Sequence, residues 1–252
     1  MSAKFFLISI LVLFSLNAFS LEKLKIAIDA TYPPMEFEAD DGKIIGLDVD
    51  LARELGKLLN KEIEFVVMPW DGILAGLMSN RYDLIMSAMN ITTERSQQVN
   101  FVPYMNMAQV FVIRNGEKPV VSEKDLTNKI VAVQADTTSS SAVEEFQKKG
   151  IKIKSIKTFK GAVDNFVALK SKQADVIVID DVVAFYYVAL DKKTFAVSGT
   201  ALKPMPIGIA VKKTDKILYN LISEKIKILK ANGTYKKLYQ KWLHTDPKEN
   251  AI

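Results

Sequence analysis

The sequence contains no cysteine, and its 252 residues include a single histidine, His244. Without thiols the chain has no disulfide framework, no thiolate metal site, no catalytic thiol and no lipid-modified cysteine. One histidine cannot build a multi-histidine metal site, and it leaves a histidine-based catalytic triad nearly excluded. We therefore expect neither a bound metal nor another cofactor.

Clusters of basic and aromatic residues are also missing. The chain has 34 basic and 29 acidic residues, and its lysines are scattered over predicted helices. Even the densest basic stretch, residues 212–241, is interpreted as helices with solvated lysines. This distribution argues against a nucleic-acid partner. The overall composition, 49% hydrophobic and 25% charged, is that of an ordinary globular chain.

Long apolar runs are confined to the N-terminus. Lys4 precedes an apolar run at residues 5–14, broken only by Ser9, and Ala18-Phe19-Ser20 follows as a small-x-small cleavage site. The pattern predicts a signal peptide over residues 1–20, with an uncleaved anchor as the alternative. No later segment reaches the roughly 18 apolar residues of a membrane span. We expect a soluble protein in the periplasm of a double-membrane bacterium.

Short aliphatic runs alternate with amphipathic stretches after the N-terminus, as is typical of βαβ units with a mostly parallel sheet. The first series has strands at 24–28, 63–67 and 83–88 and helices at 48–59 and 72–79. The second series, after Asn115-Gly116, has strands at 130–133, 151–155 and 175–179 and helices at 142–149 and 163–171. Residues 77–86 and 169–178 match in pattern, so each series predicts one α/β lobe.

An aliphatic run at 207–211 and two helices, split at Asn232-Gly233, follow the second series. These helices have no strand partners of their own, so we expect them to pack on the first lobe. The fold class is α/β, with two Rossmann-like lobes joined by two hinge strands near 109–113 and 204–209. Lobe 1 comprises residues 21–111 and 207–247, lobe 2 comprises 112–206, and 248–252 form a C-terminal tail. Ligands of such sheets bind in the cleft at the carboxyl ends of the strands.

Candidate ligand-binding residues follow several of the predicted strands. Residues 87–95 form a strand-turn-helix start with a capping threonine and Arg95 in the first helical turn, which suits a carboxylate. The hydroxyl-rich segment 134–141 opens a helix in lobe 2, where Ser141 and Glu144 fit a capping box. Arg95 alone is more often a surface residue, and capping alone would explain the hydroxyls.

Acidic and aromatic residues complete the candidate pocket. Asp180 and Asp181 end a strand of lobe 2, where one carboxylate would pair with an ammonium and the other would cap the next helix. Asp29, Tyr32 and Trp70 lie just beyond the first two strands, where the rings would contact an aliphatic stem or a cation. As lone aromatics, the two rings would more often belong to the core.

At these residues the chain resembles the polar amino-acid-binding proteins of ABC importers (solute-binding protein family 3), which have the type II periplasmic binding fold. The resemblance covers nearly all of the chain after the signal peptide. It is carried by DATYPPMEF at 29–37, GLDVDLA at 46–52, WDGI at 70–73, NITTER at 90–95, ADVIVID at 174–180, NGTY at 232–235 and KW at 241–242.

The resemblance implies a role for each matching position. Arg95 would bind the α-carboxylate with help from Asn90 and Thr138, and Asp180 would bind the α-ammonium. Tyr32 and Trp70 would stack on the ligand side chain, and Asp29 would meet its polar end. The remaining ligand-binding candidates are Ser87, Ala88, Gln134 and Thr137.

Three positions depart from the family pattern, and they weaken the implied carboxylate contacts of the loop at 137–139. Ala88 replaces Gly or Ser, Asn90 replaces Ser or Thr, and Asp136 stands where Gly is common. Asp29, assisted by Glu36 and Gln134, favours a cationic side chain such as arginine, lysine or histidine, with glutamine left open.

The resemblance further implies a monomer that delivers a free L-amino acid to the membrane permease of an ABC transporter and catalyses no reaction. Two alternatives remain open. One is a cyclohexadienyl or arogenate dehydratase-like enzyme on the same fold, for which Asp29, Asp180 and Asp181 would be candidate acids. The other is a ligand-sensing receptor component that acts through a separate partner.

Overall fold

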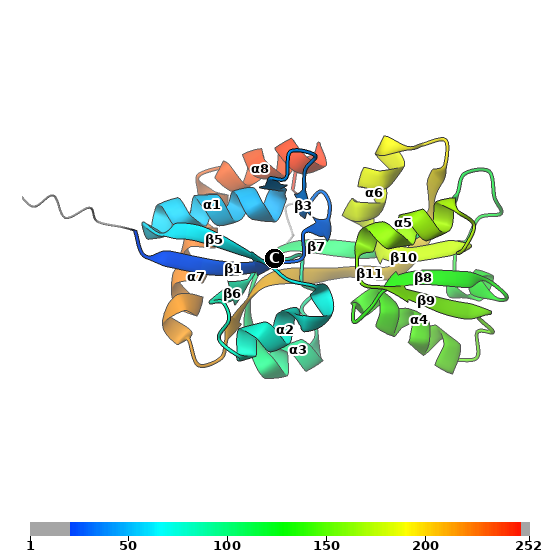
Figure 1. Cartoon of the computed structure of the whole chain (residues 1–252), viewed down its shortest axis with the longest axis horizontal. Coiled ribbons are helices and arrows are strands. Elements are labelled where there is room, and N and C mark those ends of the chain that lie inside the picture. Colours follow the sequence, from blue (N-terminus) through cyan, green and yellow to red (C-terminus); the bar gives the residue numbers. More distant parts are fainter. Residues whose placement is uncertain (1–20, 248–252) are drawn as a thin grey trace, which may run out of the picture.

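The computed structural model describes residues 21–247. The predicted signal peptide at 1–20 and the tail at 248–252 lie outside the described residues. Two α/β lobes lie side by side along the longest axis and are joined by strands that pass from one lobe to the other (Figure 1). The predicted fold class is therefore confirmed.

One sheet runs through both lobes. Its eight strands are ordered β5-β1-β6-β11-β7-β10-β8-β9. Those nearer the lobe 1 edge are β5 (Glu62–Val67), β1 (Lys23–Ile28), β6 (Leu84–Ile85) and β11 (Phe195–Lys212). Those nearer the lobe 2 edge are β7 (Val99–Arg114), β10 (Val176–Asp180), β8 (Ile130–Gln134) and β9 (Ser155–Phe159). A small second sheet in lobe 1 contains β2 (Thr31–Tyr32), β3 (Glu36–Glu38) and β4 (Ile44–Ile45).

Helices cover both faces of this sheet (Figure 1). Lobe 1 contains α1 (Leu47–Leu59), α2 (Trp70–Met78), α3 (Thr93–Gln98), α7 (Lys216–Ala231) and α8 (Thr234–Leu243). Lobe 2 contains the 3-10 helix η1 (Glu123–Leu126) and the helices α4 (Thr138–Lys148), α5 (Ala162–Lys170) and α6 (Asp181–Leu190). None of the described helices is long and apolar enough to cross a membrane.

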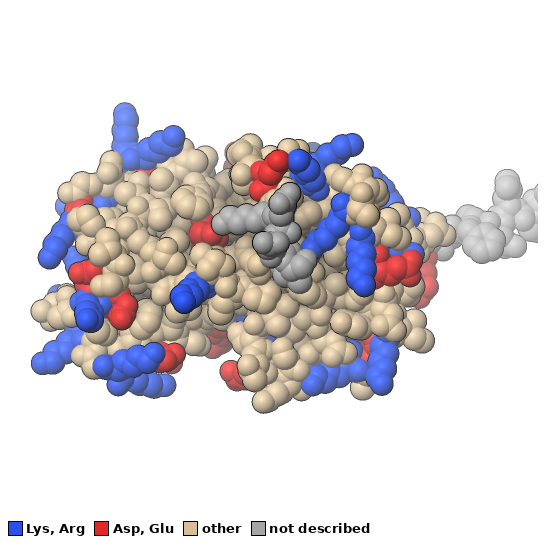
Figure 2. Space-filling model, turned by 180° about the vertical axis from the view of Figure 1, so that it is seen from behind, with Lys and Arg blue, Asp and Glu red and all other residues tan. Residues whose placement is uncertain are grey.

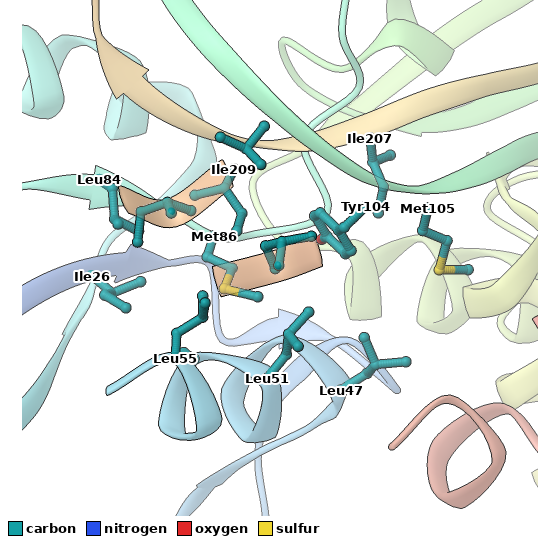
Figure 3. Packing of buried hydrophobic residues seen from close by; sticks show 14 of the residues in the cluster. Ile26, Leu47, Leu51, Leu55, Leu84, Met86, Tyr104, Met105, Ile207 and Ile209 are labelled. Carbon is teal, nitrogen blue, oxygen red and sulfur yellow. The ribbon is translucent and has the colours of Figure 1, made fainter. Parts of the chain in front are cut away.

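The lobe 1 core shows why the helical periodicity was informative. Apolar residues of α1 recur four positions apart, so one face of the helix packs against the sheet. Figure 3 shows this face opposite residues of β1, β6, β7 and β11: Leu47, Leu51 and Leu55 on α1, and Ile26, Leu84, Tyr104 and Ile209 on the strands. The terminal helices α7 and α8 pack on the same core, as expected from their lack of strand partners.

The two long strands β7 and β11 pair antiparallel along almost their whole length. Near one end β11 pairs with β6 of lobe 1, and near the other end β7 pairs with β10 of lobe 2. The pairing is irregular between Val197 and Gly208, with register shifts that include Thr200/Leu202 and Leu202/Met205. Bulges interrupt the ladder and bend and twist the strand, so the pairing between the lobes is disrupted locally in this segment.

Two sequence predictions in lobe 2 are wrong. The strand predicted at 151–155 begins instead at Ser155, because Ile153 turns into the lobe 2 core from a loop. The helix predicted from Ala142 starts at Thr138, because the hydroxyl of Thr137 accepts the N–H of Ser140 and caps the helix earlier than the Ser141/Glu144 capping box.

Charged residues show no concentration of one sign on the face shown in Figure 2, where lysine and arginine side chains are spread over both lobes.

Candidate functional site

A cavity lies between the lobes at the carboxyl ends of β1, β6, β8 and β10. The volume of the cavity is about 20 Å³, which is room for about one water molecule. A larger ligand therefore fits only if the side chains or the lobes around the cavity move. The lining residues are Asp29, Tyr32, Glu36, Trp70, Ser87, Ala88, Asn90, Gln109, Gln134, Thr137, Thr138, Ser139, Val178, Ile179 and Asp180.

Ten of the eleven residues predicted as ligand-binding line this cavity, although they come from segments far apart in the sequence. The exception is Arg95, whose side chain lies beside the cavity. Its Nη1 donates to the carbonyl of Asn90 (3.1 Å) and its Nη2 to the carbonyl of Asp136 in lobe 2 (3.1 Å). The guanidinium also lies over the Trp70 ring, 5.3 Å from its centroid. In this conformation Arg95 bridges the lobes, and reaching a ligand would require exchanging one of these bonds.

Direct hydrogen bonds between the lobes close the cavity. Tyr32 Oη donates to Asp180 Oδ2 (2.7 Å), and Gln134 Nε2 donates to Asp29 Oδ2 (2.7 Å). Three more pairs cross the cleft: Trp70 Nε1 to the Asp136 carbonyl (3.0 Å), Thr138 Oγ1 to Asn90 Oδ1 (2.8 Å), and the Ala162 N–H to Thr31 Oγ1 (3.3 Å). The polar groups that would hold a ligand are thus the same groups that hold the lobes together.

Four buried polar atoms around the cavity have no hydrogen-bond partner among the described residues. One is a donor, Asn90 Nδ2, and three are acceptors: Asp180 Oδ1, Gln109 Oε1 and Glu36 Oε2. Buried polar atoms are nearly always satisfied in native proteins, and exceptions point to ligand or functional sites. The wall therefore offers both an unused donor and unused acceptors to a ligand.

The two neighbouring aspartates of lobe 2 have separate positions. Asp180, the last residue of β10, is buried and faces the cavity. Asp181 begins α6 and lies on a different groove on the outside of the cleft, where its Oδ1 accepts the N–H of Val182. Burial raises the pKa of Asp180 to about 6, and the hydrogen bond from Tyr32 opposes this rise. A cation next to ionised Asp180 would therefore stabilise this carboxylate more than it would stabilise a carboxylate exposed to water.

Asp29 occupies the lobe 1 side of the cavity. Its Oδ1 accepts from Thr31 Oγ1 (2.9 Å), and Gln134, which bonds its other oxygen, also donates to the carbonyl of Lys160 (2.9 Å). Burial raises the pKa of Asp29 although these hydrogen bonds act to lower it. Together the two buried aspartates make the cavity favourable for positive charge, while Arg95, whose pKa burial lowers, supplies the opposite charge beside it.

Sequence reasoning missed several lining residues. Glu36 was considered only as an assistant to Asp29, and Gln109 and Ser139 were not assigned to the site. Gln109 is the one polar residue in the apolar segment 107–113 of β7, which was an available signal, and its side chain donates to Thr138 Oγ1. Among the described residues no cluster of three or more potential ligands for a metal ion occurs.

A two-lobed fold with polar groups of both lobes around an interlobe cavity defines a ligand-binding protein that closes on its ligand. The chain belongs to the bacterial extracellular solute-binding proteins, family 3, whose model matches residues 24–245.

Individual relatives agree with this assignment. The L-cystine-binding protein TcyJ of Escherichia coli (strain K12) is 29% identical over 225 residues, which cover 88% of this chain and 83% of that protein. An ancestral arginine-binding protein bound to arginine has 35% identity and a TM-score of 0.84, covering 88% of this chain and 99% of that one. The ancestral amino-acid-binding protein AncCDT-1, a precursor of cyclohexadienyl dehydratase, has 37% identity and a TM-score of 0.81, covering 88% and 95%. Other relatives carry the names of arginine-, glutamine- and histidine-binding proteins.

Proposed function

We propose that this chain captures a free L-amino acid with a cationic or polar side chain in the interlobe cavity and delivers it to the membrane permease of an ABC transporter. Capture would occur in the periplasm, after removal of the signal peptide, by a monomer. The observation that carries the proposal is Asp180, a buried carboxylate with one oxygen that has no partner among the described residues and that faces a cavity containing an unused donor.

The arrangement suits a zwitterion. The ammonium group would bind Asp180, with the nearby Gln109 Oε1 as a second acceptor. The carboxylate would bind the Asn90 amide and the first N–H groups of α4, a helix start that favours negative charge. Arg95 would join this contact by exchanging its bond to a backbone carbonyl, a smaller rearrangement than moving the helix that carries it.

The side chain of the ligand would extend toward Asp29. Three features support a cationic or polar ligand: a buried carboxylate at the lobe 1 end, the aromatic rings of Tyr32 and Trp70 in the wall, and relatives named for arginine, histidine and glutamine. An acidic side chain would meet the carboxylate of Asp29, which disfavours glutamate and aspartate.

Binding would drive closure only by contacting both lobes at once, because a ligand shifts an equilibrium only through differential affinity for the two states. The interlobe bonds of Asp29 and Asp180 would be exchanged for bonds through the ligand.

A thermal-shift screen of the mature protein against the twenty amino acids tests the proposal, since a ligand at 100 times its Kd stabilises the folded state by about 2.7 kcal/mol. Isothermal titration calorimetry then ranks L-arginine, L-lysine, L-histidine and L-glutamine. If no α-amino acid shifts the melting temperature, the proposal is wrong.

We also propose that the chain binds without catalysis. AncCDT-1, the dehydratase precursor among the neighbours, is itself described as an amino-acid-binding protein. A general acid would need a departing group held beside it, and the buried carboxyls of this cavity are already bonded across the cleft. Incubation with prephenate and with arogenate, followed by chromatography, should show no product. Product formation would instead assign the dehydratase activity.

A further inference from the structure

Two carboxyl groups are buried in contact behind the lobe 1 wall of the cavity. Glu36 on β3 and Asp48 on α1 have no exposed surface, and each carboxyl group acts on the pKa of the other, so the two groups lie close together. A hydrogen bond between two carboxyl groups needs a proton on one of them, because two carboxylates would be two acceptors that repel. Burial of the two groups beside each other therefore favours one shared proton on the pair.

Glu36 connects this pair to the segment that carries Asp29. Its Oε1 accepts from the hydroxyl of Ser87 (2.7 Å), and Ser87 Oγ in turn accepts the backbone N–H of Asp29 (2.9 Å). The single hydroxyl proton of Ser87 is thus used inside the protein rather than offered to the cavity. Ser87 orients the end of β1, from which the Asp29 side chain enters the cavity.

Asp48 holds the second ligand-facing segment. Its Oδ2 accepts the backbone N–H of Ala88 (2.9 Å), and both of its oxygens lie within 2.8 Å of Tyr104 Oη. Ala88 has a φ of 46°, a left-handed conformation that is uncommon for a residue other than glycine and that needs support from its surroundings. The turn from Ser87 to Asn90 carries three lining residues, so Asp48 fixes the geometry of this part of the wall.

The proton belongs on Glu36. Asp48 already receives the hydroxyl of Tyr104 and the N–H of Ala88, whereas Glu36 Oε2 has no donor among the described residues. A protonated Glu36 becomes a donor to Asp48 and still accepts from Ser87. Burial, and next the charge of Asp48, raise the pKa of Glu36 well above its usual value, which agrees with this assignment.

We propose that Glu36 and Asp48 are positioning residues that share one proton and together hold the backbone at Asp29 and at Ala88 in the geometry that binds the ligand. This inference rests on the proposed amino-acid binding and deepens it. Glu36, although it lines the cavity, then acts as a neutral group, and only Asp29 meets a cationic side chain with a full charge.

Among the described residues, neither carboxyl group of the pair forms an ion pair with a lysine or an arginine. The titratable groups whose charges act on it are Asp29 after β1, Tyr32 on β2, Tyr104 on β7 and Tyr235 on α8, all of which are neutral or negative. Removing the shared proton would therefore leave adjacent negative charges without compensation, and the structure favours the protonated state.

The test compares Glu36→Gln and Glu36→Ala, with L-arginine and L-glutamine as calorimetric probes. Gln keeps both bonds, since its amide donates to Asp48 and its oxygen accepts from Ser87, so affinities for both probes should stay within about threefold of wild type. The Ala variant loses both bonds, so its affinity for both probes should fall by about tenfold or more. Infrared spectroscopy at neutral pH should show a protonated-carboxyl band in wild type that Glu36→Gln removes.

Asp83→Ala is the matched control for Glu36→Ala. This carboxylate also holds a backbone N–H of β1, that of Lys25 (2.8 Å), but at the end of the strand away from the cavity. The control should keep the affinity for both probes while its stability falls, which separates positioning of the site from general support of the sheet.

Three outcomes would overturn the inference. The first is an unchanged affinity in Glu36→Ala, and the second is the lack of a protonated-carboxyl band in wild type. The third is a loss of L-arginine binding but not of L-glutamine binding in Glu36→Gln, which would show that Glu36 acts as a counter-charge. If Glu36→Ala does not fold, Glu36→Gln and the infrared measurement decide alone. Wild-type protein that binds neither probe, nor any other amino acid, refutes the proposed function, and the infrared band still tests the pair.

Discussion

Replacing Asp180 with Asn should lower the affinity for the ligand without lowering the stability of the folded protein. The substitution keeps the shape of a side chain that is 4% exposed and keeps an oxygen for Tyr32, but it removes the negative charge. A hydrogen bond to a charged group contributes about 1.5–3 kcal/mol, so the affinity for L-arginine and L-glutamine should fall by about 10- to 150-fold.

The stability should change in the opposite direction. Burial raises the pKa of Asp180 from 3.8 to about 6, so the folded state binds the proton more tightly than the unfolded state does. Ionisation therefore opposes folding at all pH values above 3.8, by an amount that grows to its full value above pH 6. The difference of about two units corresponds to roughly 3 kcal/mol at pH 7. The Asn variant should accordingly unfold at an equal or higher temperature than wild type.

Calorimetric titration and thermal unfolding of the same samples measure both quantities. The matched control is Asp181→Asn, the next residue along, whose side chain lies on the other groove and should leave affinity unchanged. Equal affinity of Asp180→Asn and wild type would refute the assignment of the ammonium site. A loss of binding accompanied by a lower melting temperature would show instead that Asp180 supports the fold.

Further predictions concern selectivity, closure and pH. Asp29→Asn should lower the affinity for L-arginine about 10- to 100-fold and the affinity for L-glutamine by less than about threefold, as measured by calorimetry. An equal loss of affinity for both amino acids would place the ligand side chain elsewhere. Trp70→Phe keeps a ring beneath Arg95 but removes the bond to the Asp136 carbonyl, so small-angle scattering should show a smaller closed fraction and affinity should fall about 2- to 10-fold. Wild-type affinity should decrease as pH falls through about 6, where Asp180 becomes protonated, and the Asp180→Asn profile should lack this step.

The sequence predicted the strand ends better than the side-chain contacts there. Asp29, Ser87, Gln134 and Asp180 follow apolar runs, and parallel strands bring such positions to one edge of a sheet. The start of α4 was misplaced because neighbouring hydroxyl residues could each cap the helix, and the choice between them depends on backbone geometry set by the rest of lobe 2.

The direction of the Arg95 side chain could not be read from sequence. It depends on the carbonyl of Asp136, a residue of the other lobe whose φ of 57° is left-handed and points this oxygen to both Trp70 and Arg95. The roles of Glu36 and Gln109 have the same origin, because tertiary packing, which is not encoded in the local sequence of β3 or β7, brings both residues to the cavity.

The path of the chain has a consequence for how the protein is made. The lobe 1 core is incomplete until the last third of β11 pairs with β6 and until α7 and α8 cover it, all of which lie after residue 206. The lobe 2 strands β8, β9 and β10 and helices α4 to α6 are contiguous in sequence and need only β7 and the start of β11. Because synthesis proceeds from the N-terminus, lobe 2 can therefore fold before lobe 1 is complete, and the first strands of lobe 1 must wait longest for their partners.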